Sequence, residues 1–168
     1  HHYPTKTDID TIVHAYEEWG EDCVQHLRGM FAFAIWDTRA RRLLLVRDRL
    51  GVKPLYYAEL PDGDLGFASE IKAILQHPQV ARKYRFDAVD SYLTLGYVPG
   101  PATIYDGINK LPGGHLLISE RGHTRIRQYW DLEFTNDGED GREDEYLERL
   151  DEAMLRAPLL PEDRKYAD

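Results

Sequence analysis

The chain has 168 residues, of which 42% are hydrophobic and 11% aromatic. This composition supports one domain with an apolar core and excludes wholesale disorder. The longest uncharged apolar run, residues 30–36, is far too short to span a membrane. The single cysteine excludes an internal disulfide or a cysteine-cluster zinc site, and this low cysteine content is what we expect of a cytoplasmic protein. The net charge of −9 arises in residues 131–152, which hold eleven acidic and two basic side chains, and argues against nucleic acid or an anionic membrane as partner.

Hydrophobic periodicity and turn residues predict helices and strands in close succession. Apolar side chains at helical spacing predict a helix over residues 7–19 with Thr7 as its N-cap, and a second, short helix is expected over 21–27. Residues 30–37 are apolar on both faces, which predicts a strand buried on both sides. The next predicted elements are strands over 42–47, 55–59 and 65–68, then helices over 70–76 and 87–95, capped by Ser69 and Asp87.

Residues 97–114 are dense in Pro and Gly, and no regular element is predicted there. Strands are expected over 115–119 and 124–130, followed by an acidic solvated linker over 131–142 and a helix over 143–156. Antiparallel strands with helices on their faces indicate an α+β fold. Because one strand requires cover on both sides, we expect a four-layer α-β-β-α sandwich of antiparallel sheets.

Few residues suggest chemistry by their pattern. Cys23 is the only candidate thiol, but it falls inside a predicted helix beside Asp22 with no nearby cation, so we interpret it as a packing residue. The seven histidines are scattered and predict no metal site. No Walker loop, GxGxxG, HExxH or GxSxG motif occurs, so nothing in the chain is expected to bind a nucleotide phosphate.

Asp8 stands at the first position of the first predicted helix, and two interpretations are open. A carboxylate there interacts favourably with the helix dipole, which alone would account for it. Alternatively, it faces a pocket and pairs with the ammonium group of a ligand. Two other polar groups are interpreted as structural. Arg47, Asp48 and Arg49 form a cluster that fixes a turn, and Ser69–Glu70 caps a helix.

Several runs of residues, in one order, resemble class II glutamine amidotransferases. They are TDID at 7–10, HAYEEWG at 14–20, LRGMFAFAIWD at 27–37, RDRLGVKPLYY at 47–57 and FASEIKA at 67–73. Within that class, YVPGPATIY at 97–105, KLPGGH at 110–115 and QYWD at 128–131 resemble glutamine-hydrolysing asparagine synthetase. The resemblance spans about residues 5–131.

The resemblance implies a glutaminase domain of the N-terminal-nucleophile (Ntn) hydrolase fold, with L-glutamine as substrate. In that family an N-terminal cysteine, with its own α-amino group as base, attacks the glutamine amide to give a glutamyl thioester and ammonia. Ammonia passes through a tunnel to a synthetase domain, where ATP and Mg²⁺ serve the amidation of aspartate. Asp8 matches the aspartate that binds the α-ammonium of glutamine. No other site residue is carried over.

Departures from the family pattern limit what this chain is expected to do. The segment with the nucleophilic cysteine, the carboxylate-binding arginine loop and the Asn-Gly-Glu strand has no counterpart in it, nor has the pyrophosphate loop. We therefore expect residues 1–130 to be the latter part of a truncated glutaminase domain, 131–142 an acidic linker, and 143–168 a helix leading towards the synthetase domain. Alone, the chain is expected to be inactive. The alternatives are an amidotransferase with another acceptor, or a catalytically dead binding module, and a homodimer is compatible with each.

Overall fold

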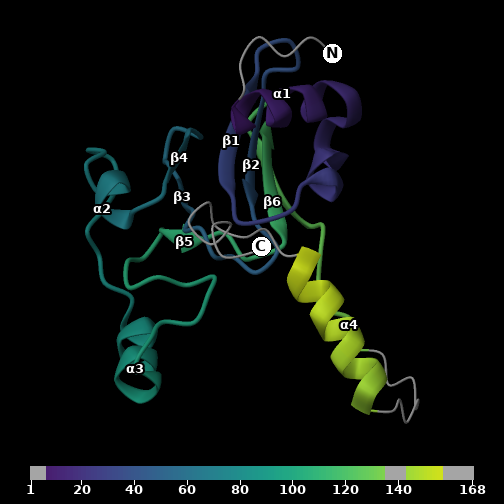
Figure 1. Ribbon diagram of the computed structural model, residues 1–168. Coiled ribbons are helices and arrows are strands. Elements are labelled where there is room, and N and C mark those ends of the chain that lie inside the picture. The colour runs from purple at the N-terminus through teal and green to yellow at the C-terminus, as the bar shows by residue number, and fades with distance from the viewer. Residues whose placement is uncertain (1–6, 135–142, 157–168) are drawn as a thin grey trace. The chain divides into compact units, whose positions relative to one another are not determined.

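The computed structural model describes residues 7–134 and 143–156, and the chain divides into two units, His1–Asp131 and Leu132–Asp168. The first unit holds two antiparallel sheets with helices on their outer faces (Figure 1). The second holds α4 (Glu143–Arg156), with the bounds predicted from the sequence. Most of the predicted acidic linker, residues 135–142, lies outside the described residues. No helix among those described is long and apolar enough to cross a membrane.

The helical layer at the start of the chain consists of α1 (Asp8–Trp19) and η1 (Gly20–His26). The predicted first helix is confirmed, and it ends where Gly20 adopts a positive φ of 57°. The second predicted helix is present as a 3₁₀ helix. Ala15 of α1 and two residues of η1, Cys23 and Val24, are buried against the sheet below.

The four-stranded sheet has the order β1-β2-β6-β7, with every neighbouring pair antiparallel. Its strands are β1 (Ala32–Asp37), β2 (Arg42–Arg47), β6 (His115–Glu120) and β7 (His123–Gln128). The two central strands are apolar on both faces. Leu44 and Val46 of β2 pack under the helical layer, whereas Leu45 points to the other side, towards the second sheet.

The three-stranded sheet has the order β4-β3-β5 and comprises β3 (Tyr56–Glu59), β4 (Leu65–Ala68) and β5 (Asn109–Lys110). Its side chains also alternate between two layers. Tyr57 packs with Leu45 and Leu117 of the first sheet, whereas Ala58 packs with Ile74 of α2 (Ile71–Ile74) on the outer face. One apolar cluster lies between the helical layer and the first sheet, a second between the two sheets, and a third between the second sheet and α2. These clusters separate four layers, and the predicted α-β-β-α sandwich is confirmed.

The prediction that the strand after Met30 is buried on both sides is wrong. Ala34 is exposed and Trp36 is 58% exposed, although both belong to β1. The reason is the position of β1 at the edge of its sheet, beyond the three-stranded sheet that covers the inner face of β2 and β6. Full burial on both faces is found in β2 instead, where Leu44, Leu45 and Val46 are inaccessible to solvent.

Two predicted helix starts and one loop also differ from the structure. Helix α2 is a single turn preceded by Glu70, not Ser69, and α3 (Phe86–Leu95) begins after Arg85, so Asp87 lies in its first turn and does not cap it. Neither helix has a side-chain cap hydrogen bond. The strand β5 was not predicted. It has two residues, too few for a periodic pattern, and it exists because Lys110 pairs with Tyr56 of β3.

Candidate functional site

Asp8, the predicted glutamine-binding residue, is the first residue of α1 and is exposed. The chain enters the helix from an extended Thr7, whose side chain makes no cap hydrogen bond. Asp8 and Asp10 both lie in the first turn, where a carboxylate is stabilised by the helix dipole. The carboxylate of Asp8 is thus accessible to a cationic group, and its location is compatible with both interpretations of this residue.

Cys23 is buried beneath the helical layer. It is 0% exposed and packs in the same cluster as Ala15, which lies seven residues beyond Asp8, or about 10 Å along the helix axis. Burial raises the pKa of the Cys23 thiol to about 11. A nucleophilic cysteine requires an accessible thiolate, so this thiol has the properties of the packing residue predicted from the sequence.

Arg47 and Asp48 form a buried hub at the end of β2. The guanidinium group of Arg47 donates to three carbonyl oxygens, those of Lys53 at 2.8 Å, Leu111 at 2.6 Å and Gly51. The carboxylate of Asp48 accepts the amides of Val52 and Lys53, each at 2.9 Å. Burial lowers the pKa of Arg47, but charge-assisted hydrogen bonds compensate for its desolvation. The pair therefore fixes the loop between β2 and β3, as expected from the sequence. It does so by binding backbone carbonyl and amide groups of the loop.

The turn before β6 packs directly on this hub. The amide of Gly114 donates to the carbonyl oxygen of Asp48 at 2.8 Å, and a Cβ atom on Gly114 would overlap the carbonyl oxygen of Trp130. The hydroxyl group of Tyr129 donates to the carbonyl oxygen of Arg47 at 2.7 Å. Burial raises the pKa of Tyr129 to about 12, so this hydroxyl remains a donor. Gly114 of the KLPGGH motif and Tyr129 of the QYWD motif thus complete the hub.

Ser69 and Glu70 lie on the surface before α2 and are both exposed. The Glu70 carboxylate pairs with the ammonium group of Lys72 at 2.5 Å, and both side chains are largely solvated. A solvated pair of this kind contributes little to stability. The predicted helix cap at Ser69 is wrong, because Glu70 precedes α2 and no side chain caps it.

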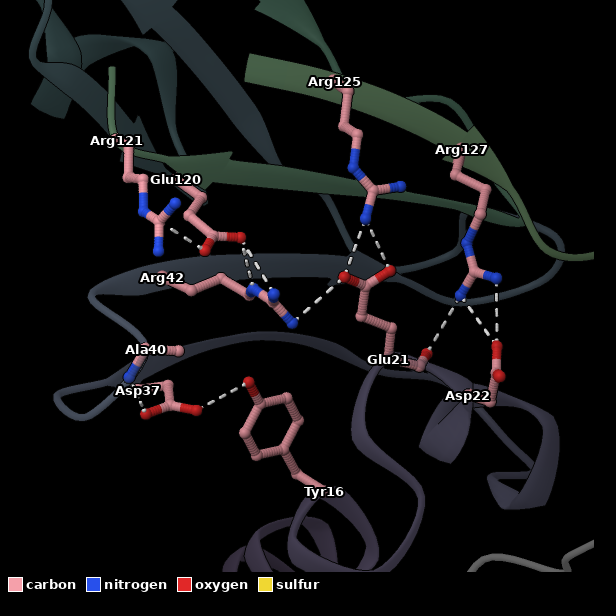
Figure 2. A network of polar contacts seen from close by, with 10 residues as sticks. All are labelled: Tyr16, Glu21, Asp22, Asp37, Ala40, Arg42, Glu120, Arg121, Arg125 and Arg127. Atoms are coloured by element: carbon pink, nitrogen blue, oxygen red, sulfur yellow. Dashed lines mark hydrogen bonds and ion pairs between the residues drawn. The ribbon is translucent and has the colours of Figure 1, made fainter. Parts of the chain in front are cut away.

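A network of charged side chains joins the helical layer to the strands beneath it, and sequence reasoning missed it (Figure 2). The carboxylate of Glu21 in η1 binds Arg42 of β2 at 3.2 Å and Arg125 of β7 at 2.7 Å. Arg42 also binds Glu120 at 2.9 Å, and that hydrogen bond is the main reason why the pKa of Arg42 is raised. Glu21 therefore links η1 directly to β2 and β7, and Arg42 extends the network to β6.

Two further contacts extend the network at its ends. Arg127 pairs with Asp22 at 3.0 Å, and the hydroxyl group of Tyr16 donates to Asp37 at 3.1 Å (Figure 2). The only sequence signal for this arrangement is that Arg125 and Arg127 alternate and so share one face of a strand. Within residues 7–134 and 143–156, no group of three or more His, Cys, Asp or Glu side chains is arranged to hold a metal ion.

Comparison with known proteins identifies the family. A family model described as a glutamine amidotransferase domain matches residues 1–130. The chain is 40% identical over 134 residues to asparagine synthetase [glutamine-hydrolyzing] 3 of Bacillus subtilis (strain 168), covering 79% of this chain and 22% of the relative. It is 40% identical over 133 residues to a putative asparagine synthetase [glutamine-hydrolyzing] 2 of Methanocaldococcus jannaschii, covering 76% of this chain and 25% of the relative.

The fold is also found among solved structures. Glutamine phosphoribosylpyrophosphate (PRPP) amidotransferase from B. subtilis superposes with a TM-score of 0.50 at 18% sequence identity, covering 77% of this chain and 24% of that chain. At this identity the match shows the fold alone. The chain spans about a quarter or less of the length of the relatives it matches. By the family match over residues 1–130, the chain belongs to the glutamine amidotransferase domain family.

Proposed function

We propose that this chain is part of a glutamine-dependent asparagine synthetase and belongs to the portion that hydrolyses glutamine to glutamate and ammonia. The observation that carries the proposal is the 40% identity over 134 residues to a protein named as a glutamine-hydrolysing asparagine synthetase. In the longer protein, ammonia released from glutamine amidates aspartate in a synthetase portion that holds ATP and Mg²⁺ outside residues 1–168.

Asp8 binds the α-ammonium group of glutamine in this proposal. Its exposed position at the start of α1 supports the role, because a cationic ligand can approach the carboxylate without displacing a packed side chain. A charge-assisted hydrogen bond of this kind selects free glutamine over glutamine within a peptide, whose nitrogen is an uncharged amide. The helix dipole stabilises the carboxylate before the ligand arrives.

The reacting thiol of the proposed enzyme lies outside these 168 residues. Cys23 is the only cysteine in the chain, and its side chain is inaccessible, with a pKa raised to about 11 by burial. At neutral pH almost none of this thiol is ionised, and no substrate can reach it. The 168-residue chain by itself is therefore expected to release no ammonia from glutamine.

The experiment uses the full reading frame that encodes this chain. The purified protein is assayed for glutamate release and for asparagine formation with glutamine or ammonium chloride as nitrogen donor. We expect both donors to support asparagine formation that requires aspartate and ATP. Amidation of another acceptor, or no amidation with either donor, would contradict the proposed function.

A pair of variants in the same helical turn tests Asp8. We expect Asp8→Asn to raise the KM for glutamine by roughly a hundredfold, since a charged hydrogen bond contributes about 3 kcal/mol. Asp10→Asn serves as the matched control and should leave that KM within about threefold of the wild-type value. Ammonia-dependent synthesis should be unaffected in both. An unchanged KM in Asp8→Asn would assign this residue to the helix dipole alone.

A further inference from the structure

A cavity of about 960 Å³ lies where three hairpin turns of the first unit meet. The turns connect β1 to β2, β3 to β4 and β6 to β7, and each contributes residues to the lining. Asp8 is not among the lining residues, and neither Arg47 nor Asp48 of the buried hub is. The cavity is therefore distinct from the proposed glutamine site.

The turns of the four-stranded sheet bring three arginine side chains to this cavity, those of Arg39, Arg41 and Arg121. Arg42 of β2 pairs with Glu120 of β6, so Arg41 and Arg121 lie next to this pair in two adjacent turns. Both have a φ of 53°, a left-handed conformation that glycine, asparagine and aspartate adopt more readily than arginine does. Positive charge is thus concentrated at turn positions where the local conformation does not favour arginine.

These guanidinium groups keep hydrogen-bond donors available for a ligand. Among the described residues, none forms an ion pair with Arg39 or Arg41. Arg121 approaches the Glu120 carboxylate to 3.9 Å, but that carboxylate also binds Arg42 at 2.9 Å (Figure 2). Each guanidinium group carries five donors in a planar fork that fits the oxygens of a phosphate or carboxylate group. The cavity therefore has donors for an anion with several oxygens.

The turn of the three-stranded sheet supplies carboxylates to the same cavity, those of Asp62 and Asp64. The Asp62 carboxylate accepts the amide of Asp64 at 3.2 Å, which orients it within the turn. Within the part of the chain that the structure describes, neither aspartate forms an ion pair with an arginine of the cavity. His77 also lines the cavity, and Trp36, which is 58% exposed, adds an aromatic ring. Opposite charges thus line one cavity without pairing, which leaves room for a ligand that contacts both.

We propose that this cavity, called here the turn cavity, binds a sugar phosphate. The phosphate group accepts hydrogen bonds from the guanidinium groups of Arg41 and Arg121, and hydroxyl groups of the sugar donate to the carboxylates of Asp62 and Asp64. The apolar face of the sugar ring packs on Trp36. A phosphate group has three terminal oxygens, which suit several guanidinium groups better than the two oxygens of a carboxylate. The inference does not depend on the proposed function.

Calorimetric titration of the full-length protein tests the site. Glucose 6-phosphate is the probe, and glucose and inorganic phosphate are titrated separately. We expect the ester to bind at least roughly tenfold more tightly than inorganic phosphate, since only the ester contacts both the arginines and the aspartates. Inorganic phosphate that binds as tightly as the ester would overturn the proposal by showing a plain anion site. No binding of the ester at concentrations up to about 10 mM would also overturn it.

Glycine substitutions remove the two guanidinium groups without straining the turns. Arg41→Gly combined with Arg121→Gly should raise the dissociation constant of glucose 6-phosphate by roughly a hundredfold, because two charged donors are lost. The variant should keep the circular dichroism spectrum of the wild type, since glycine accepts a positive φ. Arg82→Met, at an exposed arginine outside the cavity, is the matched control and should leave the dissociation constant within about twofold. Binding that survives in the double glycine variant would overturn the assignment to the turn cavity.

The aspartate side of the turn cavity is tested by Asp64→Asn. This substitution should weaken binding of glucose 6-phosphate roughly fivefold and leave binding of inorganic phosphate unchanged, because only the hydroxyl groups contact this residue. An equal change for both ligands would contradict the placement of the sugar against the aspartates. Asparagine formation is not part of these measurements, so a failure of the proposed function would leave their outcome intact.

Discussion

The Nη1 atom of Arg47 donates a 2.6 Å hydrogen bond to the carbonyl oxygen of Leu111. This contact joins the last residue of β2 in the four-stranded sheet to the residue that follows β5 in the three-stranded sheet. The same guanidinium group binds the loop that connects β2 to β3. One side chain, itself only 6% exposed, therefore holds together two sheets and the loop between them, and its bond to Leu111 lies in the interior.

Removing this guanidinium group should be costly. We expect Arg47→Met to lower the free energy of unfolding by about 3 kcal/mol, because three carbonyl oxygens lose a charged donor and that of Leu111 is buried. Urea denaturation followed by tryptophan fluorescence measures the change. Arg39→Met, at an exposed turn residue, is the matched control and should change the stability by less than about 0.5 kcal/mol. Equal effects of the two substitutions would refute the stabilising role of the Arg47 hydrogen bonds.

The close approach at Gly114 predicts a second large effect. Gly114 and Gly122 both have positive φ angles, 66° and 78°, but only at Gly114 would a Cβ atom overlap a backbone oxygen. We expect Gly122→Ala to cost about 1 kcal/mol for the left-handed conformation alone. Gly114→Ala should cost more than about 3 kcal/mol, since the backbone of Trp130 must also move. Thermal unfolding of the two variants would contradict this interpretation if their midpoints coincide.

The environment of Cys23 predicts an unreactive thiol. A pKa raised from 9.0 to about 11 lowers the thiolate content at pH 7.5 by roughly a hundredfold, and burial adds a steric barrier. Labelling with a thiol reagent should therefore be at least roughly a hundredfold slower in the native chain than in the chain unfolded in urea. Rapid stoichiometric labelling of the native protein would show an accessible thiolate and would undermine the argument that the nucleophile lies elsewhere.

Asp37 predicts a loss of stability in acid. The amide of Ala40 contributes most to holding the pKa of this carboxyl group below its ordinary value of 3.8, with further hydrogen bonds from Tyr16 and the amide of Arg39. Because the folded pKa is depressed, the stabilisation is present above the unfolded value and is lost as the pH falls through the folded value. Urea midpoints between pH 2 and 6 should fall less steeply for Asp37→Asn than for the wild type. Parallel curves would exclude this carboxylate as a contributor.

The contact between Glu21 and Arg125 can be measured by a double-mutant cycle. The Glu21 carboxylate is only 18% exposed and also binds Arg42, so we expect a coupling energy of about 1 kcal/mol with Arg125. The exposed pair of Glu70 and Lys72 provides the comparison and should give about 0.2 kcal/mol. High salt should reduce both couplings. A coupling near zero for the first pair would mean that packing of η1, and not its charges, fixes it to the sheet.

Local sequence pattern was sufficient to predict most helices and strands, and to predict that Cys23 is not a nucleophile. The bounds of β2, β4 and α4 agree with those expected, because two are short apolar runs bounded by polar turns and the third has apolar side chains at helical spacing. The interpretation of Cys23 as a packing residue is supported by its complete burial among apolar side chains. The role of Asp8 remains a prediction from the motif. Its location is now known, but no ligand contact tests it.

The sequence by itself determined the order of the elements, the layered α+β architecture and the family, because these depend on residue type and spacing along the chain. The tertiary structure decided which strand lies at the edge, and so why Trp36 is exposed while Leu45 is not. It also decided that Arg47 binds Leu111 and that Glu21 binds Arg125, contacts between residues 64 and 104 positions apart. Such pairs leave no periodic trace in the sequence, because they are fixed by the pairing of distant strands and not by local conformational preference.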